Sequence, residues 1–292
     1  QCDGEEQITL DYCSMRFALW SNGDLTIDNR EKIMKFLRDA GMENCSPAFV
    51  PLTKDIMRSL AAHRDKPLSG DKVTRIKADL GRMGWLKETT HILLATSHSI
   101  LSSLCATPNS AAPDAMKHMY RYLQHAKDLC LVKRAGCKSG LIGSADADFA
   151  GAFALTGDTR SRSGVYYEYN GMPVVAKSSY QNSSLTGFHG SFGEFMDRTD
   201  SVIADSSAMA ETMATALGLK EGLHLTYVGE ELGIRLPDVL KIQVDANAAL
   251  GFIRNTSGNS MMKHIQLKSD WMRLLRNTFG YELVKVPGTE NP

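Results

Sequence analysis

The sequence lacks the cysteine spacing of a metal site and lacks an excess of either charge. Its six cysteines include no C-x-x-C pair and no repeated spacing, which favours free thiols in a reducing compartment over a zinc site or a disulfide framework. Lys and Arg number 33, as do Asp and Glu, so the formal net charge is zero. Because no overall field attracts nucleic acid, any site for a polyanion must be a local patch.

Long apolar runs, internal repeats and low-complexity tracts are also absent. No run approaches the length of a membrane span, and no basic segment followed by an apolar one opens the chain, so we expect no membrane partner. An intracellular protein, cytoplasmic or nuclear, is the expectation. The chain begins at Gln1 rather than Met, which leaves a secreted form open.

What is present predicts two folded units. A chain of 292 residues with 43% hydrophobic residues can bury two cores. We place the first unit at residues 1–135 and expect it to be mainly helical after an initial β-hairpin. The hairpin is expected from β-branched and aromatic residues at 6–20 and a turn at 21–24. Apolar periodicity predicts helices at 29–41, 70–87, 91–105 and 112–128.

The second unit, residues 136–292, has an α/β order. Three short strand-like runs separated by turn residues indicate an antiparallel meander. A long helix, a buried strand, another helix and a last strand follow, and a Gly- and Ser-rich segment at 183–200 indicates a long loop. The expected strands are 141–151, 163–170, 172–180, 240–244 and 281–286, with helices at 205–232 and near 261–277.

Three acidic residues occupy positions that this topology can bring together. Asp146 lies in the first strand of the meander, Glu211 in the long helix and Asp245 directly after the strand at 240–244. Phosphodiester hydrolysis by divalent ions needs several carboxylates converging on one point. Taken singly, each acid is better explained as a surface or helix-capping residue; Asp245, for example, could cap the short helix that follows it.

Six motifs, in order, resemble the ribonuclease H domain of copia-type retrotransposon polyproteins. They are SADADFAG at 144–151, SRSGVYYEYNGMPVVAKSS at 161–179, SSAMAETMATALG at 206–218, VDANAAL at 244–250, MMKHIQLKSDWMR at 261–273 and YELVKVPGTENP at 281–292. The resemblance implies a ribonuclease H-like mixed five-stranded sheet flanked by helices. It also implies that Asp146, Glu211 and Asp245 are catalytic and hold two Mg²⁺ or Mn²⁺ ions.

Some positions depart from the family pattern. Gln266 stands where the family carries a further acid, Asn259 replaces a histidine, and Met209 replaces a glutamate. Asp270 lies one helical turn beyond Gln266 and is a further candidate for the catalytic set, although a surface acid is the ordinary interpretation.

The first half resembles the polymerase thumb and connection of the same polyproteins. The matching segments are GMENCSPAFVPL at 41–52, DLGRMGWL at 79–86 and MYRYLQHAKDLCL at 119–131. No Tyr-x-Asp-Asp polymerase motif occurs, so we expect no polymerase activity from this chain. Basic residues at 72–82 and 117–134 would grip duplex nucleic acid in the family, but they are equally well explained as solvated helix faces.

The resemblance implies that the substrate is an RNA–DNA hybrid or another nucleic-acid duplex, read through its backbone and 2′-hydroxyls. The residues expected to contact it are Arg160, Arg162, Lys177, Lys263 and His264.

Two other functions remain open. The chain could be a domesticated retrotransposon fragment with weak or no activity that binds a protein partner through the 183–200 loop, in the extreme as a secreted effector. It could also be an inactive connection-like subdomain that positions nucleic acid for a separate polymerase.

Overall fold

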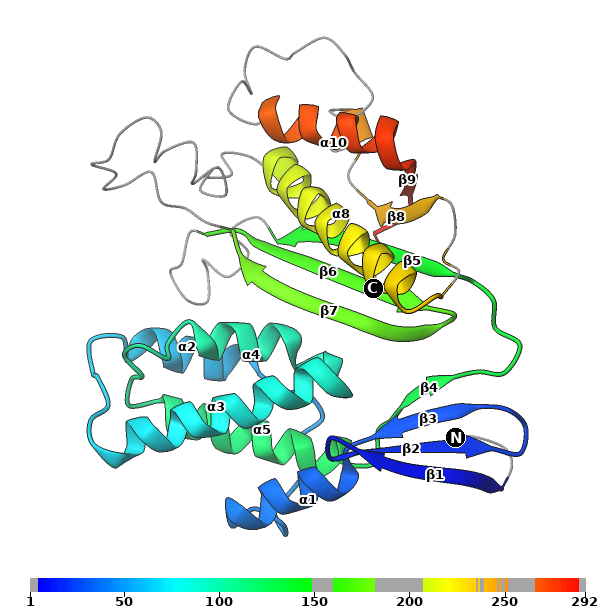
Figure 1. Ribbon diagram of the computed structural model, residues 1–292. Coiled ribbons are helices and arrows are strands. Elements are labelled where there is room, and N and C mark those ends of the chain that lie inside the picture. The colour runs from blue at the N-terminus through cyan, green and yellow to red at the C-terminus, as the bar shows by residue number, and fades with distance from the viewer. Residues whose placement is uncertain are drawn as a thin grey trace. The chain divides into compact units, whose positions relative to one another are not determined.

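The computed structural model describes residues 5–148, 160–181, 207–234, 236, 239–245, 247, 250–251 and 266–288. The chain divides into two compact units, formed chiefly by Gln1–Lys138 and by Ser139–Pro292. Each unit has its own sheet and its own helices (Figure 1).

The first unit contains a four-stranded antiparallel sheet in the order β1-β2-β3-β4. Its strands are β1 (Glu6–Tyr12), β2 (Met15–Trp20), β3 (Leu25–Asp28) and β4 (Leu131–Lys133). The predicted hairpin with its turn at 21–24 is present as β2 and β3, but the arm expected at 6–20 is two strands, β1 and β2, rather than one. Cys13 and Ser14 adopt φ angles of 52° and 63° and form a two-residue turn, a geometry that usually requires Asn or Gly.

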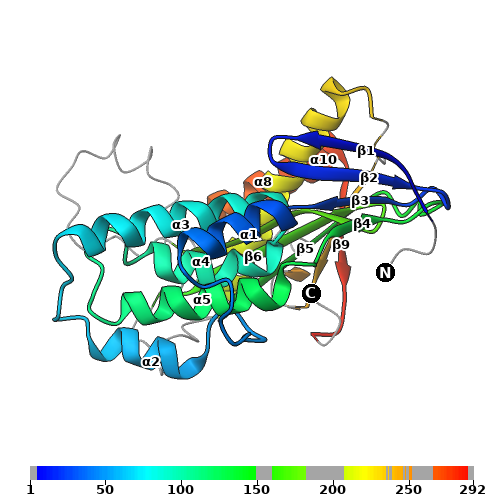
Figure 2. The same cartoon turned by 90° about the horizontal axis from the view of Figure 1, so that it is seen from below.

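Helices make up the rest of the first unit, as the apolar periodicity predicted. They are α1 (Arg30–Asp39), α2 (Lys54–Ala62), α3 (Asp71–Thr89), the 3-10 turn η1 (Ile92–Leu94), α4 (Ala95–Ser102) and α5 (Ala112–Ala126). Helices α1, α2 and α3 all pack on α5 (Figure 2). Their shared core includes Leu37, Met83, Leu86, Met119 and Leu123, all fully buried. Helix α2 was not predicted, although Thr53 caps its first turn by accepting a hydrogen bond from the Ile56 amide.

The second unit is a five-stranded mixed sheet in the order β7-β6-β5-β8-β9. Strands β5 and β6 are antiparallel, whereas β8 pairs in parallel with both β5 and β9. The strands are β5 (Leu141–Asp148), β6 (Arg162–Tyr169), β7 (Met172–Tyr180), β8 (Leu240–Val244) and β9 (Tyr281–Lys285). With the helices α8 (Ser207–Glu231) and α10 (Gln266–Phe279), this confirms the predicted fold class.

Helix α8 packs on β5, β6 and β8, and α10 packs on α8 and β9 (Figure 1). Buried residues occur on most sides of α8, and they include Met209, which stands where the family has a glutamate. The buried residues lie almost all between Met209 and Gly222, whereas Tyr227 and Val228 in the second half of the helix are exposed. The enclosed first half needs little amphipathic periodicity, since it has almost no solvent face.

Small residues let α8 approach the sheet closely around one buried tyrosine. The ring of Tyr167 is fully buried and lies against Gly143, where an added Cβ would overlap it. The hydroxyl of Tyr167 donates a hydrogen bond of 2.7 Å to the Gly218 carbonyl of α8. A Cβ at Gly218 would lie 3.1 Å from the Ala145 Cβ. The phenol therefore fills the layer between sheet and helix, and glycine is needed where the two come closest.

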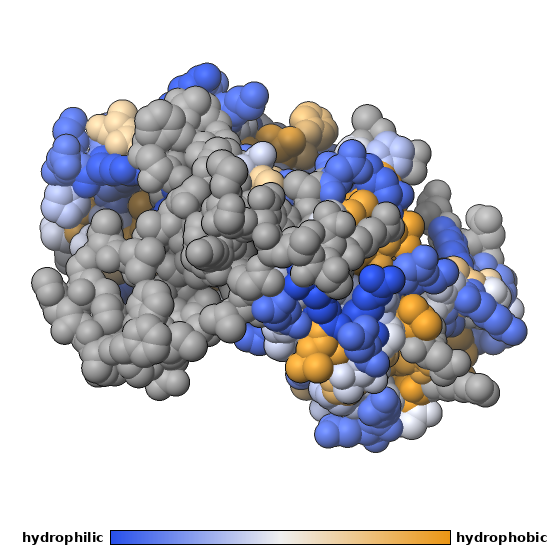
Figure 3. Space-filling model, turned by 90° about the horizontal axis from the view of Figure 1, so that it is seen from above, coloured by the Kyte–Doolittle hydropathy of each residue, from blue (hydrophilic) through white to orange (hydrophobic). Residues whose placement is uncertain are grey.

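No helix among the described residues has both the length and the apolar character needed to cross a membrane. On the coloured part of the face in Figure 3, hydrophobic residues form separate spots among hydrophilic ones.

Substitution of Gly222 tests the close packing of α8. A Cβ there would overlap the Tyr167 hydroxyl and lie 2.5 Å from the Leu240 Cδ2, so we expect Gly222→Ala to destabilise the second unit by about 1–3 kcal/mol through overpacking. The control is Gly81→Ala in α3, where nothing lies within 4 Å and alanine should stabilise by about 0.5–1 kcal/mol. Urea denaturation followed by circular dichroism measures both. Equal effects of the two substitutions would contradict the packing described.

Candidate metal centre

Two strand ends and one helix bring three acidic side chains to one place. Asp146 lies near the carboxyl end of β5, and Asp245 directly follows β8. Because β5 and β8 are parallel and Ser144 pairs with Gln243, the strand ends that carry both acids lie at the same edge of the sheet. Glu211 comes from the second turn of α8, seven residues before Gly218, and residues at this spacing share one face of a helix.

The carboxylates of these three residues form a compact group. One oxygen atom from each of Asp146, Glu211 and Asp245 lies within 4.8 Å of the others. The side chains range from partly buried to exposed, so the group is open to solvent and to a substrate. The structure thus brings together the three acids whose convergence the topology predicted.

Burial and like charge oppose ionisation of two of these acids. Partial burial raises the pKa of the Glu211 carboxyl to about 7, and the charges of Asp146 and Asp245 act in the same direction. Burial and the charge of Asp245 also raise the pKa of Asp146. A hydrogen bond from the backbone amide of Ala147 lowers the pKa of each group and so offsets part of both rises. Without a cation, the group at neutral pH therefore retains a proton for part of the time.

A hard divalent cation fits this set of donors. Mg²⁺ and Mn²⁺ prefer carboxylate oxygens as ligands, and all three donors are carboxylates. A bound cation would also relieve the repulsion that raises the pKa of Glu211. The chemistry of the donor set therefore matches the ion that the sequence predicts.

Residues at the end of β9 and directly after it also approach Asp245. Lys285, at the end of β9, donates a hydrogen bond from Nζ to the Asp245 carbonyl. Gly288 approaches the carboxylate so closely that an added Cβ would lie 3.0 Å from Oδ2. Neither Lys285 nor Gly288 was predicted from the sequence to belong to the site; the only signal was the glycine in the turn after the last strand.

The structure does not bring Asp270 into the acidic group. This residue lies on α10 and forms an ion pair of 2.6 Å with Arg273, one turn further along the helix. Among the described residues, the group that could hold an ion comprises Asp146, Glu211 and Asp245. Gln266 begins α10, and its side chain lies outside the described part of the chain, as does Asn259.

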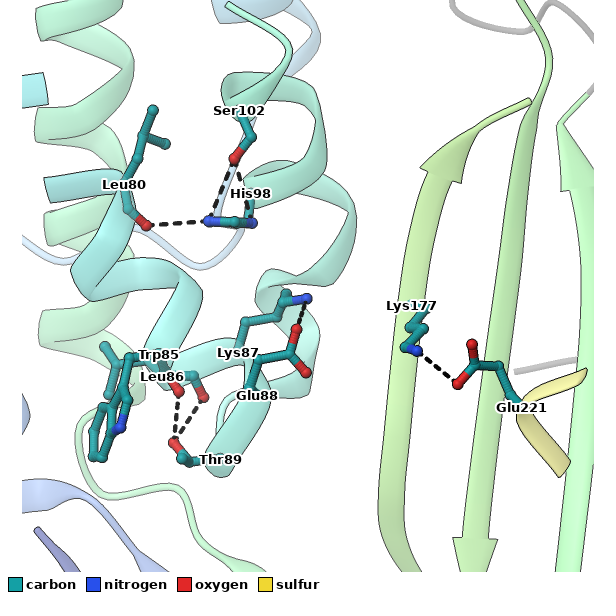
Figure 4. A network of polar contacts seen from close by, with 10 residues as sticks. All are labelled: Leu80, Trp85, Leu86, Lys87, Glu88, Thr89, His98, Ser102, Lys177 and Glu221. Atoms are coloured by element: carbon teal, nitrogen blue, oxygen red, sulfur yellow. Dashed lines mark hydrogen bonds and ion pairs between the residues drawn. The ribbon is translucent and has the colours of Figure 1, made fainter. Parts of the chain in front are cut away.

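The predicted substrate-binding cations make contacts within the protein. The guanidinium carbons of Arg160 and Arg162 lie 4.1 Å and 3.9 Å from the ring centre of Tyr180, and Arg162 is buried. Lys177 forms an ion pair of 2.6 Å with Glu221 of α8 (Figure 4). Their role in binding nucleic acid stays a prediction. Lys263, His264 and the 183–200 loop lie outside the described residues.

Substitution of Glu211 tests the electrostatics of the acidic group. The folded pKa of about 7 lies above the ordinary value of 4.5, so the protonated carboxyl stabilises the fold at low pH, and this contribution is lost as pH rises through 7. In metal-free protein, Glu211→Gln should therefore raise stability at pH 8, by roughly 1–2 kcal/mol after allowance for solvent screening of a half-buried group.

Thermal unfolding in EDTA at pH 8 and pH 5 measures this effect. Most of the gain in melting temperature should disappear at pH 5. A loss of stability at pH 8, or a gain of the same size at both pH values, would show that the three charges do not repel each other as described.

No protein-family model matches the chain. A curated relative is the retrovirus-related Pol polyprotein from transposon TNT 1-94 of Nicotiana tabacum, which is 21% identical over 270 residues. The match covers 92% of this chain and 18% of the polyprotein, so the chain spans less than a fifth of that relative's length.

Solved structures give weaker likenesses. Ribonuclease H1 from the archaeon Halobacterium salinarum is 12% identical with a TM-score of 0.34, over 52% of this chain and 88% of that one. The foamy viral protease-reverse transcriptase in complex with an RNA/DNA hybrid is 10% identical with a TM-score of 0.45, over 97% of this chain and 30% of that one. In sequence, and over nearly its whole length, the chain is similar to a retrotransposon Pol polyprotein, as its motifs predicted.

Proposed function

We propose that the second unit is a metal-dependent ribonuclease H-type endonuclease that cuts the RNA strand of an RNA–DNA hybrid. The observation that carries this proposal is the convergence of three carboxylates, from two parallel strands and one helix, within 4.8 Å of one another. Such a group destabilises a fold unless a cation is bound, so its presence at an accessible sheet edge favours a functional role over a structural one. The similarity to a retrotransposon Pol polyprotein supports the same reaction class.

Asp146, Glu211 and Asp245 would hold the ions. Bound divalent ions supply an activated water and neutralise the charge that develops on the departing oxygen. Glu211, with a pKa of about 7, must give up its proton when an ion binds, so binding releases a proton and weakens at acidic pH. The backbone amide of Ala147 favours the ionised form of both Asp146 and Glu211, which is the form that binds a cation.

The hybrid would be recognised through its backbone and 2′-hydroxyls and without preference for sequence. Arg160 fits a phosphate contact better than Arg162 does, because Arg162 is 7% exposed and Arg160 is only partly buried. Lys177 would have to exchange its ion pair with Glu221 for a phosphate. Lys263 and His264 are proposed as further contacts on the strength of the family resemblance.

A second candidate function is binding of nucleic acid without cleavage. Gln266 favours it, since this position begins α10 and carries an acid in the family. A site with three acids and one neutral group could hold the duplex and yet turn it over slowly or not at all.

A hybrid-cleavage assay with Mg²⁺ or Mn²⁺ tests the endonuclease proposal. Asp146→Asn removes one charged ligand and should lower the rate at least about 100-fold, because charge stabilisation by a bound ion contributes several kcal/mol. The matched control is Asp114→Asn on α5, whose side chain is 83% exposed and which should retain the wild-type rate. Equal activity of the wild type and Asp146→Asn, or none in either, would refute the proposal.

Titration with Mg²⁺ separates the two candidate functions. If the protein is the endonuclease, the wild type should bind Mg²⁺ and cut the hybrid, and Asp245→Asn should lose Mg²⁺ binding. Strong binding of the hybrid with no cleavage at any Mg²⁺ concentration would establish the second function instead.

A further inference from the structure

A buried glutamine joins the end of β7 to the first turn of α8. Gln181 directly follows β7 and is 6% exposed. Its backbone amide donates to the Ser161 carbonyl at 2.8 Å. Its side-chain Nε2 donates two hydrogen bonds of 2.9 Å, to the Ser163 hydroxyl on β6 and to the Ala210 carbonyl on α8. One side chain therefore ties the start of the helix to the sheet.

Both partners of Gln181 are adjacent to the acidic group. Ala210 immediately precedes Glu211, so a bond to its carbonyl constrains the backbone that carries this carboxylate. Ser163 is paired with Ala147 of β5, the residue that directly follows Asp146. Gln181 thus links the strand side and the helix side of the candidate metal centre without contributing a ligand.

The oxygen atom of the Gln181 side-chain amide lacks a hydrogen-bond donor. The Oε1 atom of Gln181 is buried and has no hydrogen-bond partner among the described residues, which destabilises the folded state. A methionine of similar length would fill the space and remove this unsatisfied acceptor. The Ala210 carbonyl would keep its partner within α8. Stability alone therefore gives a weak reason for an amide at this position.

We propose that Gln181 is a positioning residue for the acidic group, an inference that rests on the proposed function. Its Nε2 holds the first turn of α8 on β6 and thereby keeps the Glu211 carboxylate within reach of Asp146 and Asp245. Its loss weakens ion binding while the three ligands themselves stay present.

Calorimetric titration of Mg²⁺ into the full chain tests this role with Gln181→Met. The matched control is Gln124→Met, since Gln124 also donates from Nε2 to a backbone carbonyl, that of Glu43 at 2.8 Å, and also has a buried Oε1 without a partner among the described residues. Gln181→Met should weaken Mg²⁺ binding at least tenfold, and Gln124→Met should stay within twofold of the wild type.

In the cleavage assay, raising the Mg²⁺ concentration should restore most of the rate of Gln181→Met. Because Mg²⁺ also stabilises folded protein, a wild-type circular dichroism spectrum of Gln181→Met in EDTA is needed to exclude a mere loss of folded protein, and we expect that spectrum. Wild-type affinity in Gln181→Met, or equal weakening in both variants, would overturn the inference.

Failure of the proposed function has a different signature, because the wild type itself would then bind no Mg²⁺ and cut no hybrid. Crystal structures of the metal-free wild type and Gln181→Met decide the role of Gln181 in that case. A Glu211 carboxylate displaced beyond 4.8 Å from Asp146 in the variant supports the inference, and an unchanged position overturns it.

Discussion

The close packing of α8 on the sheet is the constraint on which the candidate metal centre depends. Gly218 and Gly222 contribute no side chain where α8 comes closest to the sheet, and Tyr167 of β6 fills the space and bonds to the helix backbone. Glu211 lies two turns before Gly218 on the same face. A larger side chain at Gly222 would overlap Tyr167 and Leu240, and a shift of the helix that relieved this overlap would also displace Glu211 from the two aspartates.

The packing holds together groups that repel one another. Burial and the charges of the two aspartates raise the pKa of Glu211 to about 7. The ionised acidic group is therefore electrostatically unfavourable, and the rest of the fold must offset this. Residues outside the acid set contribute to this stabilisation. The Ala147 amide offsets part of the rise, and Lys285 donates a hydrogen bond to the backbone carbonyl of Asp245. Electrostatic repulsion of this kind is typical of functional sites, where a bound ligand of opposite charge neutralises it.

Sequence patterns were sufficient for the order of elements and for the meeting of the three acids. Apolar periodicity and turn residues predict the strands of the second unit within a few residues, and parallel pairing then requires Asp146 and Asp245 to share one edge. Patterns were insufficient where contacts join residues distant in sequence. The burial of Arg162 and the bond from Gln181 to Ala210, 29 positions apart, follow from tertiary packing and leave no local signal. Helix α2 was a different kind of omission, because Thr53 and Asp55 form a helix start that the sequence does show.

Anomalous diffraction from crystals of the full chain soaked in Mn²⁺ is the most direct measurement of the central claim. We expect an anomalous peak at the edge of the sheet, with oxygen atoms of Asp146, Glu211 and Asp245 at coordination distance, about 2.0–2.3 Å. The contrary result is a structure without metal at this edge, in which the three carboxylates point apart or a basic side chain lies between them.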